Sequence, residues 1–381
     1  MSIDYPVVVY GANGYTGRLV CEHLGELGIP FIAAGRSKKK LEEMMQIVPG
    51  IERSKHMIVE VENTVEALSE LVRGRKVVCN TVGPMNRFAR ELLQACYNER
   101  VSYLDTTGEQ HWIRELMDHW HEKFRSIERL VIPSCSYMYG VCELGARVCL
   151  ETPGIDSIDA TSIADGVPTV ASARTILDAI RHPSVYLKNN ELVPYKGIEN
   201  SRITSPEGTV LTASTWGGTA LPIWFSRDGR IRNAKMMCAM WNQELYKKEL
   251  ELERLNKTTF QWIPDEILYP MMDKMAEGIT AGTPPRESRY VHRAIDVCVG
   301  RGPVGMVKTT MVSNGGYYTT GLIQAYVASR LVYETPPKVV GFASPSEAFG
   351  HRNILGVMES YGYAKLGVQK IIGNHVEGAA A

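Results

Sequence analysis

The chain has 381 residues, of which 44% are hydrophobic and 22% charged, so it is a soluble globular protein too long for one ordinary core. Its 42 basic and 42 acidic residues cancel, which argues against nucleic acid as a partner. No apolar run approaches the roughly 18 residues that span a bilayer, so we expect no integral membrane segment. A strand begins almost at the N-terminus and leaves no room for a signal peptide, so we expect a cytoplasmic protein.

The first predicted strand, Val7–Val9, is a β-branched run typical of a strand buried on both faces. Three glycines at steps of three follow it, and Arg18–Leu27 continues at helical spacing. Strand, glycine turn and helix start together predict a dinucleotide-binding βα unit, whose turn approaches a pyrophosphate and whose helix N-terminus binds its charge. A plain tight turn is the alternative. The candidate cofactor-binding residues are Gly11, Asn13, Gly14, Tyr15, Thr16 and Gly17.

The second predicted strand, Phe31–Ala34, ends at Gly35, Arg36 and Ser37, and three lysines follow. A protein that selects NAD usually carries an acidic residue here, about 20 residues beyond the glycines, for the ribose 2′-hydroxyl. An arginine fork suits a 2′-phosphate instead, and cations at a helix start need a reason, although a solvated basic helix start is the alternative. We therefore predict NADPH as the cofactor, with Arg36 and Ser37 at its 2′-phosphate.

The strand and helix alternation continues through Met57–Val59, Val65–Val72, Lys76–Asn80, Phe88–Tyr97, Val101–Leu104, His111–Phe124 and Leu130–Pro133. These elements complete a six-stranded unit. Ligands of an open parallel sheet lie beyond the carboxyl ends of its strands, so the loop of Thr81, Val82, Gly83 and Pro84 should border the ribose and nicotinamide.

Four motifs in this order resemble the saccharopine-dehydrogenase-like reductases, a group with saccharopine reductases and trans-acting enoyl reductases: Y-G-A-N-G-Y-T-G, A-G-R-S, N-T-V-G-P and Y-L-D-T-T-G-E. The resemblance implies that the Gly83–Pro84 loop and the loop from Asp105 to Glu109, with Gly108, border the nicotinamide and the active-site cleft. Glu109 is also placed to cap the next helix.

The segment Pro133–Gly140 departs from the G-F-D-S-x-P-x-D stretch that relatives often carry, because it lacks both aspartates. It has two phenols instead. Tyr137 and Tyr139 are candidates to donate a hydrogen bond or a proton to a substrate carbonyl, or alternatively pack the domain boundary.

From about Gly154 the pattern changes to longer strands, which predicts a second domain. The expected fold class is α/β, with an N-terminal Rossmann-type doubly wound parallel sheet and a second α+β domain on a mostly antiparallel sheet. We expect the NADP-binding domain at 1–135, with segment 335–381 packing back on it, and a substrate and dimerisation domain at 136–334 with a helical insertion at 242–278. Its predicted elements are strands Ser157–Ile163, Thr209–Thr215, Ala220–Phe225, Ala234–Met240, Arg289–Val299 and Val304–Val312, and helices Ala171–Ile180 and Gly321–Val332.

The second domain is rich in tryptophan and methionine, including Trp216, Trp224, Trp241, Trp262, Met236, Met237, Met240, Met271, Met272 and Met275. Such side chains line an adaptable pocket for a bulky apolar ligand, or alternatively form the core or the interface of a homodimer, which we expect. Gly315–Thr320 resembles the family's G-Y-x-x-T helix start, which makes Tyr317 a third candidate proton donor.

Eight cysteines show no C-x-x-C pair, so we expect buried thiols and no metal. Cys135, Cys142 and Cys149 recur every seven residues, which predicts one face of a packed helix.

The sequence favours an NADPH-dependent reductase that transfers hydride to a bulky, largely apolar small molecule, most simply the C=C bond of an α,β-unsaturated carbonyl compound. Saccharopine-type chemistry at a C–N bond is an alternative; it needs basic groups for carboxylates, for which Arg174, Arg181, Arg227, Arg286 and Arg289 are available. A non-catalytic NADPH-binding scaffold or sensor is another alternative, because both inter-domain aspartates are missing.

Overall fold

The computed structural model describes residues 4–197, 199–215, 219–279, 284–288, 290–303, 305–334, 336–372 and 375–379, and the Trp216, Arg289 and Val304 of the sequence predictions lie outside these ranges. The chain forms two compact units. Unit 1 comprises residues 1–107, 112–136 and 317–350, and unit 2 comprises residues 108–111, 137–316 and 351–381. The C-terminal segment 335–381 is therefore divided between the two units.

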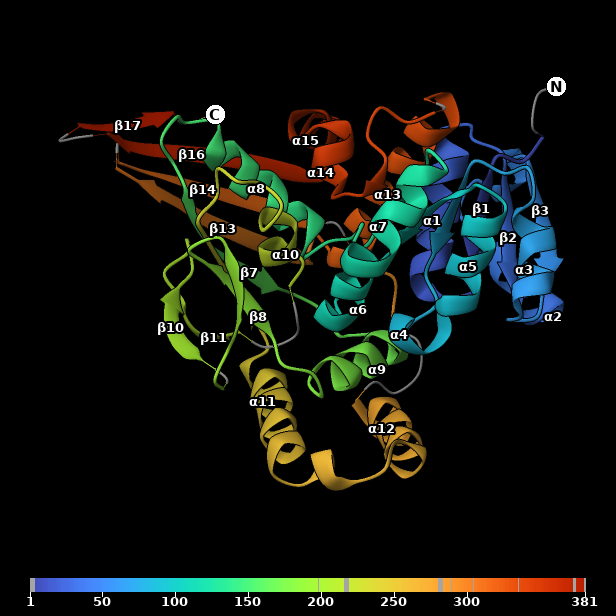
Figure 1. The fold of residues 1–381 in the computed structure, drawn as a ribbon, viewed down its shortest axis with the longest axis horizontal. Coiled ribbons are helices and arrows are strands. Elements are labelled where there is room, and N and C mark those ends of the chain that lie inside the picture. Colours follow the sequence, from blue (N-terminus) through green and yellow to red (C-terminus); the bar gives the residue numbers. More distant parts are fainter. Residues whose placement is uncertain are drawn as a thin grey trace. The chain divides into compact units, whose positions relative to one another are not determined.

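Unit 1 is built on a seven-stranded sheet whose described pairs are all parallel, in the order β15-β6-β5-β4-β1-β2-β3. Its strands β1, β2 and β3 are labelled in Figure 1. The sequence predicted six of these strands, and the seventh comes from the C-terminal part of the chain. The strands are β1 (Val7–Tyr10), β2 (Phe31–Gly35), β3 (His56–Glu60), β4 (Val77–Asn80), β5 (Ser102–Asp105), β6 (Leu130–Ile132) and β15 (Gly341–Phe342).

The strands of unit 1 that lie in the middle of the sheet are mostly apolar, and β1, β2 and β4 are buried at every position, as a sheet covered on both faces requires. The helices that belong to this unit or lead through it are α1 (Tyr15–Glu26), α2 (Lys38–Met45), η1 (Ile51–Arg53), α3 (Val65–Val72), α4 (Met85–Phe88), α5 (Arg90–Asn98), α6 (Gln110–Glu115), the π-helical turn η2 (Leu116–Trp120), α7 (His121–Ser126), α13 (Gly316–Tyr333) and α14 (Pro345–Phe349).

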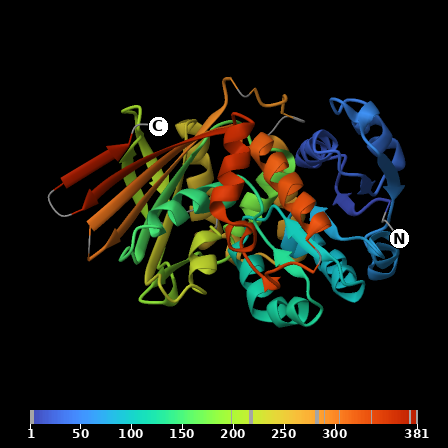
Figure 2. The ribbon, with the colours of Figure 1, turned by 90° about the horizontal axis from the view of Figure 1, so that it is seen from above.

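Unit 2 is built on a ten-stranded mixed sheet in the order β10-β11-β12-β7-β13-β14-β16-β17, to which β8 adds by pairing with β12 and β9 by pairing with β8. The β7–β12 pair is parallel and the other described pairs are antiparallel. Figure 2 shows the strands β14, β16 and β17, coloured orange to red, side by side. The strands are β7 (Ser157–Ala164), β8 (Val185–Lys188), β9 (Glu191–Pro194), β10 (Asn200–Thr204), β11 (Val210–Ser214), β12 (Asn233–Met240), β13 (Arg293–Gly302), β14 (Gly305–Asn314), β16 (Ala364–Ile372) and β17 (His375–Ala379).

One face of this sheet packs against α8 (Gly140–Leu150), which comes close because Gly145 has no side chain: a Cβ there would lie 3.0 Å from Thr309 Oγ1. Cys142 and Cys149 lie on this helix as the sequence predicted, whereas Cys135 precedes it. All eight cysteines are buried free thiols, as expected. The other helices of unit 2 are α9 (Val170–Ala179), α10 (Leu221–Phe225), α11 (Gln243–Thr258), η3 (Phe260–Trp262), α12 (Asp265–Ile279) and α15 (His351–Ser360).

The predicted strand Ala220–Phe225 is wrong, because this segment is the short helix α10. All five residues of α10 are buried, so no polar face reveals the helical period, and Pro222 in the first turn fits a helix start. The segment predicted as a helical insertion contains α11 and α12, and Pro264 lies between them.

Candidate functional site

The glycine turn joins β1 to α1 and forms a backbone cradle at the helix N-terminus. Gly11 adopts a left-handed φ of +87°, and its carbonyl accepts a hydrogen bond from the Gly14 amide at 2.8 Å. A Cβ on Gly17 would lie 2.3 Å from that same carbonyl oxygen, so only glycine allows this close approach. The first turn of α1 carries no acidic residue, and the N-cap Gly14 offers no side chain to its amides. The cradle therefore fits a pyrophosphate.

The loop after β4, which contains Thr81 and Val82, packs directly on this cradle. The Thr81 hydroxyl donates to the carbonyls of Tyr10 at 3.0 Å and Gly11 at 3.2 Å. A Cβ on Gly11 would lie 2.7 Å from Val82 Cγ2, so the glycine also makes room for this loop. The Asn80 side chain accepts from the Val82 amide at 3.0 Å and fixes the bend. Gly83 and Pro84 follow and lead into α4.

The aromatic residue of the glycine turn has a partner from the far end of the chain. The ring of Tyr15 contacts the ring of Tyr317 edge-on, with centroids 5.0 Å apart, and the Arg18 guanidinium lies over the Tyr15 ring. Tyr317 is therefore placed beside the turn within unit 1. Thr16 occupies the first turn of α1, and the Asn13 side chain lies 3.0 Å from where a Cβ on Gly35 would be.

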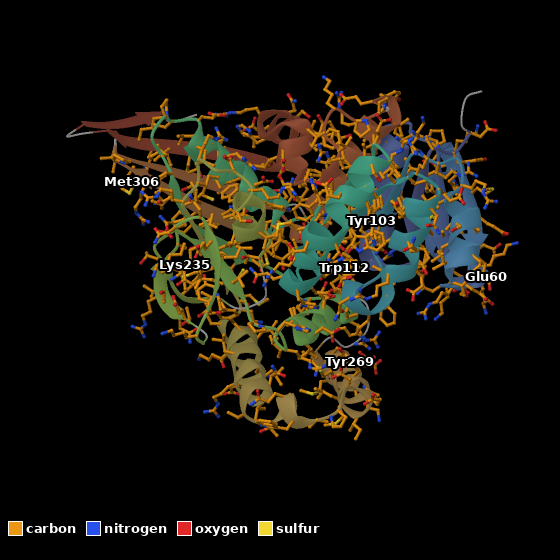
Figure 3. All side chains as sticks on the ribbon, viewed as in Figure 1. Glu60, Tyr103, Trp112, Lys235, Tyr269 and Met306 are labelled. Carbon is orange, nitrogen blue, oxygen red and sulfur yellow. The ribbon has the colours of Figure 1, made fainter. Side chains whose placement is uncertain are left out.

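The end of β2 carries the residues predicted for the 2′-phosphate. Ser37 is the N-cap of α2, its hydroxyl accepting from the Lys40 amide at 3.4 Å. Arg36 is exposed, and its charge acts on the nearby phenol of Tyr10. Glu60, at the end of β3, was not among the predicted residues, and its carboxylate accepts a hydrogen bond from the Lys38 amide at 2.8 Å. Figure 3 shows Glu60 on this edge strand. Glu60 is not among the residues that follow β2 in the sequence, because it belongs to the next strand, β3.

Asp105, at the end of β5, is buried and holds together the loops around it. Its Oδ1 accepts from the amides of Thr107 and Ser134, both at 3.0 Å. Its Oδ2 accepts from the Tyr103 hydroxyl at 3.1 Å and the Trp112 indole at 3.0 Å, the two buried rings labelled in Figure 3. Burial raises the pKa of Asp105 and the four donors oppose that rise. Each oxygen accepts two hydrogen bonds, so this carboxyl fixes the loop that follows β5.

Gly108 and Tyr139 meet within unit 2. A Cβ on Gly108 would lie 2.1 Å from the Tyr139 hydroxyl, so the absence of a side chain there makes room for the phenol. Burial raises the pKa of Tyr139 well above its ordinary value, and the buried Glu109 adds to this. Glu109 lies 3.9 Å from His111, whose ring stacks on His182 at 3.6 Å. Tyr139 is therefore a neutral phenol near the carboxyl group of Glu109.

Tyr137 takes a different environment, because Met138 between the two tyrosines has a left-handed φ of +73°. The Tyr137 hydroxyl lies 3.2 Å from the Ser162 hydroxyl, and a Cβ on Gly316 would lie 2.6 Å from the Tyr137 ring. Burial raises the pKa of Tyr137 well above its ordinary value. It is therefore also a neutral phenol, able to donate a proton.

The aromatic and sulfur-containing residues of unit 2 divide between core and surface. Trp224, Met236, Met240 and Met272 are buried in the packing, whereas Trp262 and Met271 are exposed. Across the ranges that the structure describes, no helix is long and apolar enough to cross a membrane. The same ranges hold no group of three or more His, Cys, Asp or Glu able to bind a metal ion.

The chain matches two family models. Residues 7–126 match the saccharopine dehydrogenase NADP-binding domain, and residues 140–372 match a family of unknown function (DUF5938). The N-terminal match supports NADP(H) binding by unit 1.

Two curated relatives are similar over part of their length. A lipid droplet localized protein from Caenorhabditis elegans is 31% identical over 151 residues, which cover 38% of this chain and 35% of that protein. A trans-acting enoyl reductase from Mycobacterium leprae is 29% identical over 136 residues, 35% of this chain and 32% of the relative. The chain thus spans about a third of the length of these curated relatives.

Among solved structures, apo saccharopine dehydrogenase (L-Glu forming) from Saccharomyces cerevisiae has a TM-score of 0.59 at 14% identity, covering 95% of this chain and 99% of that one. This is a likeness of fold. Together with the NADP-domain model and the enoyl reductase relative, it confirms the resemblance to the saccharopine-dehydrogenase-like reductases that the sequence motifs indicated.

Proposed function

This chain belongs to the family of unknown function (DUF5938), and we propose that it is an NADPH-dependent reductase of a bulky, largely apolar α,β-unsaturated carbonyl compound. The observation that carries the proposal is the cradle of Gly11, Gly14 and Gly17, whose backbone is open at the start of α1. The NADP-binding-domain match at residues 7–126 supports the cofactor. The partial likeness to a trans-acting enoyl reductase supports reduction of a C=C bond.

The residues of unit 1 fit the parts of the dinucleotide. We assign the pyrophosphate to the α1 N-terminus, where Asn13, Tyr15 and Thr16 complete the turn, and the 2′-phosphate to Arg36 and Ser37. The nicotinamide end is assigned to the loop after β4, with Asp105 holding the neighbouring loop. Bound NADPH supplies the hydride, and the protein orients it and excludes water.

The acid of the reaction is a phenol in this proposal. When hydride adds to the β-carbon of an enone, negative charge collects on the carbonyl oxygen, and a nearby O–H stabilises it. Tyr137 and Tyr139 meet the requirement of remaining protonated at neutral pH, because burial raises the pKa of both. Tyr317 lies beside Tyr15 and is assigned to the cofactor side, where its hydroxyl is the third candidate.

Two of the five arginines that C–N chemistry would use as carboxylate clamps, Arg174 and Arg181, form ion pairs with other side chains. Arg174 pairs with Asp273 at 3.4 Å and with Glu277 at 3.0 Å. Arg181 pairs with Asp265 at 2.6 Å. These pairs attach α9 and the segment that follows it to α12, which favours the enone over an amino-acid substrate.

The test is a turnover assay with the purified protein. We would follow loss of NADPH absorbance with benzylideneacetone, an apolar enone, and identify the product by mass spectrometry. The corresponding saturated ketone, used as substrate, controls for C=O reduction, and a 2-oxo acid mixed with an amine tests C–N chemistry. Conversion of the enone to the saturated ketone supports the proposal. Turnover of the oxo acid and amine alone would replace it, and NADPH binding without turnover of any probe would favour a scaffold or sensor.

A further inference from the structure

A second buried aspartate lies in the middle of the unit 2 sheet, on β13. Asp296 pairs with Ser162 of β7 in the antiparallel register, so the two side chains share one face of the sheet. Cys298, two residues further along β13, contacts Cys142 of α8 on that face, with sulfurs 3.8 Å apart. The face is therefore the one that α8 covers, and Asp296 is only 1% exposed.

Asp296 contrasts with Asp105, the other buried carboxyl at the centre of a sheet. Asp105 accepts four hydrogen bonds of good geometry. Among the described residues, none gives either oxygen of Asp296 a bond of that geometry, although the Ser162 hydroxyl and the Cys142 thiol are close enough to lower its pKa. A buried carboxylate with such weak donors is disfavoured, so this group gains by holding a proton. A purely structural role would be served better by an apolar side chain.

The groups that face Asp296 are phenol, thiol and hydroxyl groups. Tyr137 precedes α8, Cys142 lies on α8, and Cys238 on β12 acts on both of them. Burial raises the pKa of Asp296 to about 7, while Ser162 and Cys142 oppose that rise in part. The carboxyl therefore exchanges its proton near neutral pH.

We propose that Asp296 and Ser162 form a proton relay to Tyr137, so that Asp296 stores the proton that the phenol gives to the reduced substrate. The Ser162 hydroxyl, 3.2 Å from the Tyr137 hydroxyl and cross-strand from Asp296, links the two. This inference rests on the proposed reductase function for its last step, but the linkage itself does not depend on any ligand.

The proton transfers of this relay need no further reactant. Tyr137 breaks its O–H bond as the enolate gains the proton, and the phenolate takes a proton from Ser162. Ser162 takes its replacement from the Asp296 carboxyl, which becomes a carboxylate. After product leaves, solvent returns one proton to Asp296.

The test places 3-fluorotyrosine at position 137 and follows its fluorine resonance between about pH 5 and about pH 9, a range centred on neutral titrations. The resonance should titrate with a midpoint near 7 and become flat in Asp296→Asn. In Ser162→Ala the response should shrink severalfold, because the link is removed. Asp273→Asn, a partly exposed carboxylate of the same unit, is the matched control and should leave the titration unchanged.

A flat resonance in the otherwise unaltered protein would overturn the relay, and so would a full response in Ser162→Ala. With benzylideneacetone as the probe, Asp296→Asn should lower kcat about a hundredfold while the Kd for NADPH stays unchanged. If the protein binds no NADPH, the proposed function fails, and the fluorine titration still decides the linkage.

Discussion

The carbonyl oxygen of Gly11 lies where a side chain on Gly17 would begin: a Cβ at position 17 would be 2.3 Å from it. This contact draws the start of α1 against the strand-to-helix turn. Gly17→Ala should therefore displace the cradle and weaken NADPH binding by at least tenfold in calorimetry. Gly356→Ala, in α15 where a Cβ meets nothing within 4 Å, is the control and should leave binding unchanged. Unaltered binding by folded Gly17→Ala protein would contradict this use of the turn.

Arg36 should determine the choice between NADPH and NADH. Arg36→Ala should weaken NADPH binding by about 1.5–3 kcal/mol, since a charge-assisted hydrogen bond is lost, and leave NADH binding nearly unchanged. Lys39→Ala is the matched control, because Lys39 is the second residue of α2 and its side chain is 85% exposed. Parallel calorimetric titrations measure both differences. Equal losses for the two nucleotides would exclude a 2′-phosphate contact.

Glu60 should oppose NADPH, because its carboxylate lies at the Lys38 amide beside the residues assigned to the 2′-phosphate. Glu60→Gln removes a negative charge while keeping a side-chain acceptor for that amide. We expect NADPH to bind severalfold more tightly and NADH to change little, an effect that salt reduces. Weaker NADH binding in this variant would instead indicate that Glu60 binds the ribose.

Asp105 should be a stability residue. Asp105→Asn replaces an acceptor oxygen with an amide that faces two donors, and should lower the free energy of unfolding by about 3 kcal/mol in urea denaturation. Asp118→Asn changes an exposed carboxylate of the same unit and should have an effect below about 0.5 kcal/mol. Equal stability of the two variants would show that the four hydrogen bonds of Asp105 are not needed.

Asp296 should make stability depend on pH in the opposite sense to a salt-bridged aspartate. Its pKa is about 7 in the folded protein and about 3.9 when unfolded, so between these values the folded state binds the additional proton. Stability therefore falls as pH rises through this window, by at most about 1.4 kcal/mol per pH unit. Asp296→Asn should remove this component, which thermal unfolding at several pH values measures. An unchanged pH dependence would contradict the raised pKa.

The unit 1 fold could be predicted from the sequence because each βα repeat has a recognisable local sequence pattern. Val7–Val9 is apolar at every position, the glycines mark the turn, and helix α1 shows a buried stripe. The second sheet was harder for a physical reason. Strand β10 is exposed at four of its five positions, so it has no apolar alternation to reveal it. Helix α10 is buried at all five, which removes the helical period instead.

Site residues could be predicted from the sequence where the backbone conformation requires a particular residue type. They could not be predicted where a contact between distant parts of the chain places the side chain. Gly11 and Gly17 stand at positions where a side chain would collide, so their spacing carries information. Glu60 reaches the start of α2 from another strand, and nothing local marks it. The burial of Asp296 depends on its packing against β7 and α8, which lie more than a hundred residues earlier in the chain.

The most direct test of the account is calorimetric titration of the purified full chain with NADPH and, in parallel, with NADH. We expect saturable NADPH binding with at least a tenfold preference over NADH, since both the glycine cradle and Arg36 then contribute. Failure of both nucleotides to bind would contradict the assignment of the cradle and remove the proposed reductase with it.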